Sequence, residues 1–350
     1  MPEKKKKYYD ELNIFRAIVI IWVVIGHSFD AKGDLFGFLH FYAYTFHMKA
    51  FFILSGILFA SALVRISGIK DAGRLVISRF KRLMVPYFFF TAVSYVLKLF
   101  LERYAKNDLS SNILFDALTG RNNPNGGIWF LFALFWISLL AIALCKLPPW
   151  LNLIITLCLF TLKTLTVYLD YPIVRYIAEY AVFFFLGIFL AKYYDKISEF
   201  FKRLFESRKA LCIALSLFAF ALSVIVTSLY FKGTIAFKYF GIILIFYNTL
   251  CAYFLSLCIL EATAVKRAFM CIGNYGMDIY MIGYYVQITL RVVLMSMLSL
   301  PYLAYALPMC IFGLLLPIPI SKYFVRKFRI TRALMLGNFK KEKITNVKEA

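Results

Sequence analysis

The sequence predicts an all-α polytopic membrane protein with about ten transmembrane helices and both termini in the cytoplasm. Hydrophobic residues make up 62% of the 350 residues, whereas charged residues make up only 17%. A soluble protein of this length could not bury so much apolar surface. The apolar residues also gather in runs of about twenty, the length that a helix needs to cross a bilayer.

Windows of about twenty apolar residues locate the individual helices. The predicted ranges are 14–29, 43–63, 86–101, 128–145, 150–169, 173–191, 210–230, 238–260, 275–297 and 302–321. If the N-terminus is cytoplasmic, the inner segments hold 29 of the 40 Lys and Arg residues, as the positive-inside rule requires. We therefore expect a basic cytoplasmic N-terminus (1–13), a transmembrane domain (14–330) and a charged cytoplasmic tail (331–350).

The net charge of +22 follows from this topology, because the basic residues lie in short connections between apolar runs. We expect contact with membrane lipid and none with nucleic acid. The seven cysteines lie in or beside apolar runs, and none has the spacing of metal ligands. The sequence therefore predicts neither a disulfide framework nor a metal site.

Two polar residues share one face of the first predicted helix. A polar side chain inside a bilayer costs a few kcal/mol, so each one is a functional candidate. Arg16 and His27 fall within roughly 20° of each other around a helix and about 16 Å apart along it. The structural alternatives are a snorkelling arginine and a hydrogen-bonded interhelical histidine. The shared face favours a functional pair.

The second and third helices supply two further groups of candidates. His47 and Lys49 lie near the outer boundary of the second helix. For Lys49, the structural alternative to a functional role is an interfacial anchor. Arg79, Lys81 and Arg82 form a basic cluster just before the third helix. Guanidinium groups one turn apart suit a phosphate, although ordinary positive-inside charge also explains this cluster.

Other polar or aromatic residues in the predicted helices carry weaker signals. Trp129 has the position of an aromatic-belt residue. Arg175 and Glu179 are four residues apart and could neutralise each other. Asp278 and Arg291 in the ninth predicted helix are candidates of the same kind.

The order and spacing of several short motifs resemble the membrane-bound acyltransferase-3 family, and within it the fucose 4-O-acetylase-like branch. The motifs run from Arg16 and His27 through Phe46-His47-Met48, Phe52-Ile53-Leu54-Ser55-Gly56, Arg79-Phe80-Lys81-Arg82 with Pro86-Tyr87, and Gly127-Ile128-Trp129-Phe130-Leu131 to Ile272-Gly273-Asn274-Tyr275 with Ile279-Tyr280. The resemblance covers nearly the whole chain. Three positions depart from the family pattern: Asn13 replaces Asp, Lys49 replaces Pro, and Gly283 replaces a second His.

The resemblance implies an O-acyltransferase, in the first place an O-acetyltransferase, of the bacterial cytoplasmic membrane. Acyl-CoA, with acetyl-CoA as the expected donor, would meet a sugar hydroxyl of a cell-surface polysaccharide or its lipid-linked precursor. The donor phosphates would bind Arg79, Arg82 and Lys81. His27, supported by Arg16 and His47, would take the hydroxyl proton or carry the acyl group.

Four more residues are expected to bind substrate: Trp129, Arg175, Glu179 and Tyr280. The chain either acylates its acceptor directly or passes the group to a separate extracytoplasmic partner.

The alternative function is a transporter or flippase of a lipid-linked glycan. Repeated halves and paired Gly/Pro-interrupted helices, which point to such transporters, are not found in the sequence.

Overall fold

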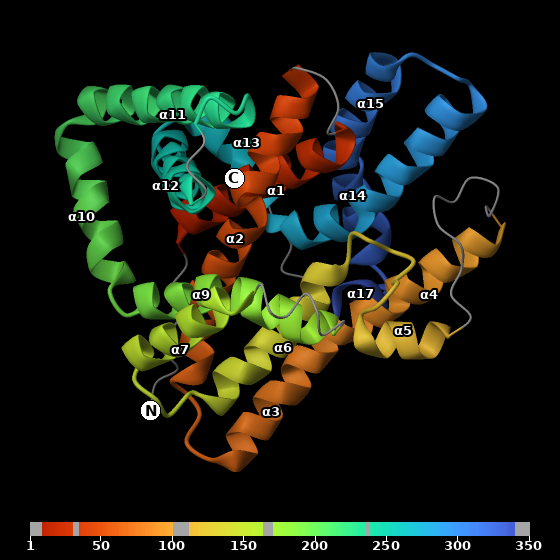
Figure 1. Cartoon of the computed structure of the whole chain (residues 1–350), viewed down its shortest axis with the longest axis horizontal. Coiled ribbons are helices and arrows are strands. Elements are labelled where there is room, and N and C mark those ends of the chain that lie inside the picture. The colour runs from red at the N-terminus through yellow and green to blue at the C-terminus, as the bar shows by residue number, and fades with distance from the viewer. Residues whose placement is uncertain (1–8, 31–34, 101–111, 164–170, 236–238, 340–350) are drawn as a thin grey trace.

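The computed structural model describes residues 9–30, 35–100, 112–163, 171–235 and 239–339 (Figure 1). All regular structure in these ranges is helical, which confirms the predicted class. The first half contains α1 (Asp10–Ser28), α2 (Leu35–Leu63), α3 (Ile69–Arg79), η1 (Phe80–Met84), α4 (Val85–Phe100), α5 (Ile113–Thr119), α6 (Trp129–Ala143), α7 (Pro149–Thr161) and α9 (Pro172–Ala191). The second half contains α10 (Tyr194–Ser207), α11 (Lys209–Phe231), α12 (Phe240–Leu260), α13 (Thr263–Asn274), α14 (Gly276–Leu290), η4 (Arg291–Met297), α15 (Tyr302–Leu315), α16 (Pro317–Ile320), η5 (Ser321–Val325) and α17 (Arg329–Leu336).

The chain is a multi-pass membrane protein. Within the described ranges, eight helical stretches are long and apolar enough to cross a bilayer: 10–28, 35–63, 69–100, 172–191, 209–231, 240–260, 276–297 and 302–325. The two remaining predicted runs form the shorter apolar helices α6 and α7, of 15 and 13 residues. The last part of the predicted range 150–169 lies outside the described residues.

The basic cluster before the third predicted helix lies inside a helix and not in a connection. Residues 69–100 form one helical stretch in which η1 is a π-helical turn, closed by a bond from the Val85 N–H to the Phe80 carbonyl. Pro86 explains this turn, because its ring would clash with the carbonyl of Arg82, four residues earlier, in a regular α-helix. A wider turn relieves the clash, so the helix continues through the cluster.

Amphipathic helices occupy segments that hydropathy marks as connections. The helix α10 is attached to the start of α1 through Glu11, whose side chain is fully buried. The Lys202 ammonium lies 2.8 Å from one carboxylate oxygen of Glu11, and the Ser198 hydroxyl donates a hydrogen bond to the other. Removing one partner of a buried ion pair is costly, so this contact fixes α10 against α1.

The closest helix crossing joins α2 and α9. A Cβ atom at Gly56 would collide with the carbonyl oxygen of Phe184, and one at Gly187 would collide with that of Ile53. Small residues at such a crossing allow the two backbones to touch, which compensates for the weak hydrophobic force between helices in lipid.

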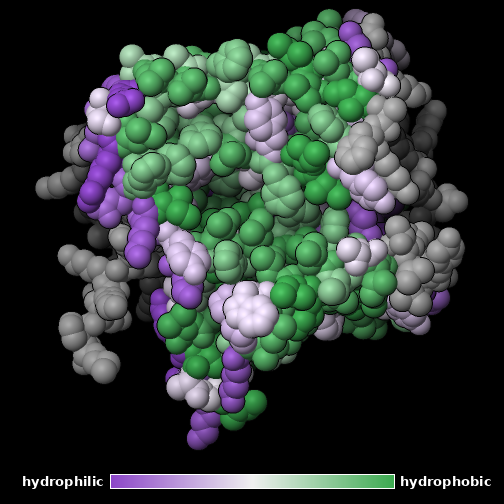
Figure 2. Space-filling model, turned by 60° about the vertical axis from the view of Figure 1, so that its left-hand side comes forward, coloured by the Kyte–Doolittle hydropathy of each residue, from purple (hydrophilic) through white to green (hydrophobic). Residues whose placement is uncertain are grey.

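The outer surface matches a lipid environment. Figure 2 shows a face covered mostly by hydrophobic side chains, with hydrophilic ones gathered along one edge and at the lower tip. After Lys209 at its start, α11 exposes large apolar side chains: Leu211, Leu215, Leu217, Phe218, Leu222, Ile225 and Leu229. Such a helix is stable only where its outward face meets hydrocarbon.

Candidate functional site

His27 lies on the last turn of α1, beside a small pocket that is partly open to the surface. The pocket is formed by α1, by Gly127 two residues before α6, and by α14. Its lining residues are Val23, Val24, His27, Gly127, Ile279, Tyr280, Tyr284 and Gln287. The structure therefore brings together His27 and Tyr280, which the sequence singled out. The Tyr280 hydroxyl donates a hydrogen bond to the Gly127 carbonyl.

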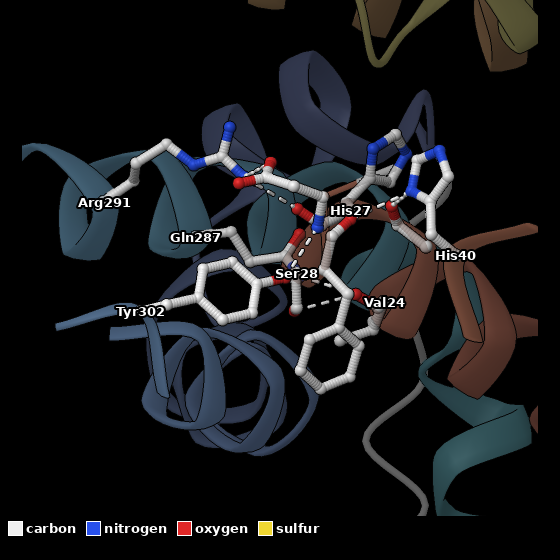
Figure 3. Close-up of polar contacts among 10 residues, drawn as sticks. Val24, His27, Ser28, His40, Gln287, Arg291 and Tyr302 are labelled. Atoms are coloured by element: carbon white, nitrogen blue, oxygen red, sulfur yellow. Dashed lines mark hydrogen bonds and ion pairs between the residues drawn. The ribbon is translucent and has the colours of Figure 1, made fainter. Parts of the chain in front are cut away.

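Side chains from other helices cap the end of α1 that carries His27 (Figure 3). The last carbonyls of a helix have no donor within it. His40 Nδ1 lies 2.9 Å from both the Gly26 and the Phe29 carbonyl oxygens. Since a carbonyl only accepts, Nδ1 must carry the hydrogen. Arg291 donates to the His27 carbonyl at 3.4 Å, and its positive charge suits the C-terminal end of the helix dipole.

One aromatic ring meets all three histidines of the chain. The ring centroid of Tyr44 lies 4.3 Å from that of His40, 5.0 Å from His47 and 6.3 Å from His27. Tyr284 contacts His27 from the other side at 5.7 Å. In the described part of the chain, the His27 ring makes no hydrogen bond, so its nitrogens are available to a ligand in the pocket.

His47 lies in a different environment from His27. It is 3% exposed, and its Nδ1 donates to the Ala43 carbonyl one turn earlier in α2. The neutral ring therefore keeps the lone pair on Nε2. The Lys49 ammonium has a protein partner, because it donates a hydrogen bond to the Tyr44 carbonyl at 3.2 Å. His47 contacts Tyr44 but does not line the His27 pocket.

Arg16 lies at the opposite end of α1, enclosed by main chain and amides. Its guanidinium donates to Asn13 Oδ1 and to the Gly273 carbonyl, both at 3.4 Å. Asn13 in turn donates to Asn274 Oδ1 at 3.1 Å. The amide oxygen of Asn13 thus accepts the hydrogen bond that a carboxylate at this position would accept. A Cβ at Gly276 would lie 3.1 Å from Arg16.

The three basic residues of the cluster do not converge on the His27 pocket. The Arg79 guanidinium lies over the Phe59 ring, 3.9 Å from its centroid. Lys81 and Arg82 are exposed on the π-helical turn. Gly337, which ends α17 with a φ of +61°, packs its backbone directly on Lys81 and Arg82. The cluster is therefore an exposed basic surface beside a C-terminal helix.

The remaining predicted substrate residues do not line the pocket. Trp129 stacks on Tyr176 with ring centroids 5.2 Å apart. The Arg175 guanidinium lies over the same tyrosine, at 5.5 Å. No ion pair joins Arg175 and Glu179, although the structure describes both residues.

Four residues of the site were not singled out by the sequence: His40, Tyr44, Tyr284 and Gln287. Gln287 carried a usable signal, because it is a polar residue inside a predicted span. His40 binds carbonyls 11 and 14 positions away, and Tyr44 reaches His27 from 17 positions away, which no local pattern reveals. No group of three His, Cys, Asp or Glu side chains in the described ranges could hold a metal ion.

Comparison with protein families gives one match. Residues 9–322 match the acyltransferase-3 family model, described as an acyltransferase domain. No curated protein and no solved structure matches the chain.

Proposed function

Because the chain belongs to the acyltransferase-3 family, whose domain covers residues 9–322, we propose that it is an acyl-CoA-dependent O-acyltransferase of the bacterial cytoplasmic membrane. It transfers an acetyl group from cytoplasmic acetyl-CoA to a sugar hydroxyl of a cell-surface polysaccharide or its lipid-linked precursor. The observation that carries the proposal is the His27 ring, which faces a pocket inside the membrane domain without a hydrogen bond from any described residue.

In the proposed reaction, His27 acts as the general base. It takes the proton of the acceptor hydroxyl while the hydroxyl oxygen attacks the carbonyl carbon of the thioester. The carbon–sulfur bond breaks as the ester bond forms, and the CoA thiolate receives the proton from His27. A positioned base of this kind contributes about 10²- to 10⁴-fold in rate. His47, with its lone pair on Nε2, is the second histidine proposed to support the site.

The donor is proposed to bind at the other end of α1. The exposed Lys81 and Arg82, with Arg79 held on the Phe59 ring, would bind the CoA phosphates, since guanidinium groups match phosphate geometry. Arg16 lies on the same helix as His27 and would stabilise negative charge on the donor along its path. Tyr280 in the pocket, with Trp129, Arg175 and Glu179 behind it, would form the acceptor side.

The test uses membranes that contain the protein, radiolabelled acetyl-CoA and the surface polysaccharide of the source strain. We expect label in O-acetyl esters of the polysaccharide only when the protein is present. Arg82→Ala should raise the KM for acetyl-CoA about tenfold, because a charge-assisted contact to phosphate is lost. The matched control is Arg74→Ala, an exposed arginine of α3 paired with Asp71 at 2.6 Å. Loss of glycan export without any CoA-dependent labelling would instead indicate a flippase and contradict the proposal.

A further inference from the structure

Gln287 is a buried amide whose NH₂ group has hydrogen-bond partners in the described residues, whereas its oxygen has none. It lies on α14 and is 3% exposed. Its Nε2 donates to the Val24 carbonyl at 2.9 Å and to the Ser28 hydroxyl at 2.7 Å. Figure 3 shows both contacts at the end of α1. A buried polar group costs free energy unless each of its atoms finds a partner.

These two contacts fix the orientation of the amide. The Val24 oxygen can only accept, so the atom that faces it must be the NH₂ group. Both amide hydrogens are then used, and Oε1 is the remaining polar atom. Within the described ranges, Oε1 has no hydrogen-bond partner, and the Gln287 side chain lines the pocket beside His27.

From this arrangement we propose that the pocket takes an acceptor with a second hydroxyl next to the one that is acylated, and that Gln287 Oε1 binds this second hydroxyl. The inference rests on the proposed function, in which the reacting hydroxyl gives its proton to His27. An oxygen with free lone pairs needs a donor from the ligand. Adjacent hydroxyls on a sugar ring supply one donor to each residue.

The proposal assigns specificity to Gln287. With one hydroxyl held on Oε1, only its neighbour lies against His27, so a single position on the sugar is acylated. An ionised phosphate or carboxylate has no hydrogen to donate to Oε1, so neither group would bind there. A lone alcohol satisfies His27 but gives Oε1 no donor, so a site that binds the second hydroxyl discriminates against it.

The experiment measures acetyl transfer to surface polysaccharide from which mild alkali has removed the existing O-acyl esters. Gln287→Met keeps the approximate shape and removes both the oxygen and the NH₂ group that donates to Val24 and Ser28. We expect the KM for the polysaccharide to rise about tenfold, as for the loss of one hydrogen bond in a buried site. The KM for acetyl-CoA should stay unchanged. NMR of the product should show acetyl groups spread over more than one hydroxyl, a change that a general loss of stability would not cause.

The matched control is Asn248→Leu. Asn248 is also a buried amide, at 1% exposure, but its Oδ1 already accepts a hydrogen bond from Ser223 at 2.9 Å. This variant should keep the KM for the polysaccharide and the single position of acetylation. If Gln287→Met does not accumulate in the membrane, Gln287→Asn replaces it, because asparagine is one methylene shorter and draws the amide back. This variant should also raise the KM for the polysaccharide and spread the acetyl groups over more than one hydroxyl.

Two results separate this inference from the function on which it rests. If His27→Ala abolishes transfer but the Gln287 variants keep the normal KM and the single position, the role of Gln287 is wrong. If an abundant His27→Ala protein transfers normally, the proposed function itself is wrong.

Discussion

The two ends of α1 hold their polar residues in different ways. At the Arg16 end, glycines bring the backbone of α13 and α14 against α1, and the guanidinium is surrounded by Asn13 and the Gly273 carbonyl. At the His27 end, the side chains of His40, Gln287 and Arg291 reach the last carbonyls of the helix. Of these three side chains, Gln287 also lines the pocket beside His27.

This difference separates backbone packing from side-chain caps along a single helix. Backbone contacts cannot move apart without displacing whole helices, so changes to the glycines at the Arg16 end should act on folding. Side-chain caps hold the position of His27, so changes at the other end should act on the rate of transfer.

The largest effect is expected for Gly273→Ala. A Cβ at this position would collide with the Asn13 carbonyl and side chain, and main-chain atoms cannot give way. The cost should reach about 3 kcal/mol, the upper range for overpacking. Thermal unfolding of the detergent-solubilised protein should show a large fall in Tm. Gly73→Ala is the control, because nothing lies within 4 Å of its Cβ; equal Tm values for the two variants would contradict the close approach.

The next effect is expected for His40→Phe. Phenylalanine keeps the ring that stacks on Tyr44 but cannot donate to the Gly26 and Phe29 carbonyls. The last turn of α1 should shift and lower kcat about 10- to 100-fold, with the KM for acetyl-CoA unchanged. His40→Asn places an N–H near the position of Nδ1 and should restore most of the rate. Identical kinetics of the two variants would rule out the capping role.

The smallest effect is expected at Asn13. Asn13→Ala removes the acceptor for Arg16 and the donor to Asn274 and Met270, at a cost of about 1–2 kcal/mol. Asn13→Asp keeps an oxygen for Arg16 and adds a charge but cannot donate, so its Tm should lie between those of the alanine variant and the wild type. A lower Tm for the aspartate than for the alanine would show that the link to Arg16 adds nothing.

Hydropathy predicted the fold well because membrane helices are marked by long apolar runs. It missed the start of α2 at Leu35, the continuation of the third helix through Arg79 and Arg82, and the amphipathic helices α10, α13 and α17. The segments other than the start of α2 carry charges, which lower the average of a twenty-residue window. Glu11 was missed for the same reason, since its burial depends on α10.

The site was predictable only in part. His27 and Arg16 were found because they are costly residues in an apolar run, and the motif that contains Tyr280 came from the family resemblance. The partners that orient them come from α2 and α14, and their proximity depends on how helices pack. The spacing of Arg79 and Arg82 suggested a shared face, whereas the π-helical turn after Arg79 changes the geometry of the cluster.

His27 is proposed to transfer the proton in the pocket, and its replacement by alanine tests this role. Acetyl transfer from labelled acetyl-CoA to the polysaccharide is compared between wild type and His27→Ala in membranes with equal amounts of folded protein. We predict that kcat falls at least about 10²-fold, while the KM for acetyl-CoA, whose proposed site lies at the other end of α1, stays within twofold. A normal kcat in a well-folded His27→Ala protein would contradict this account.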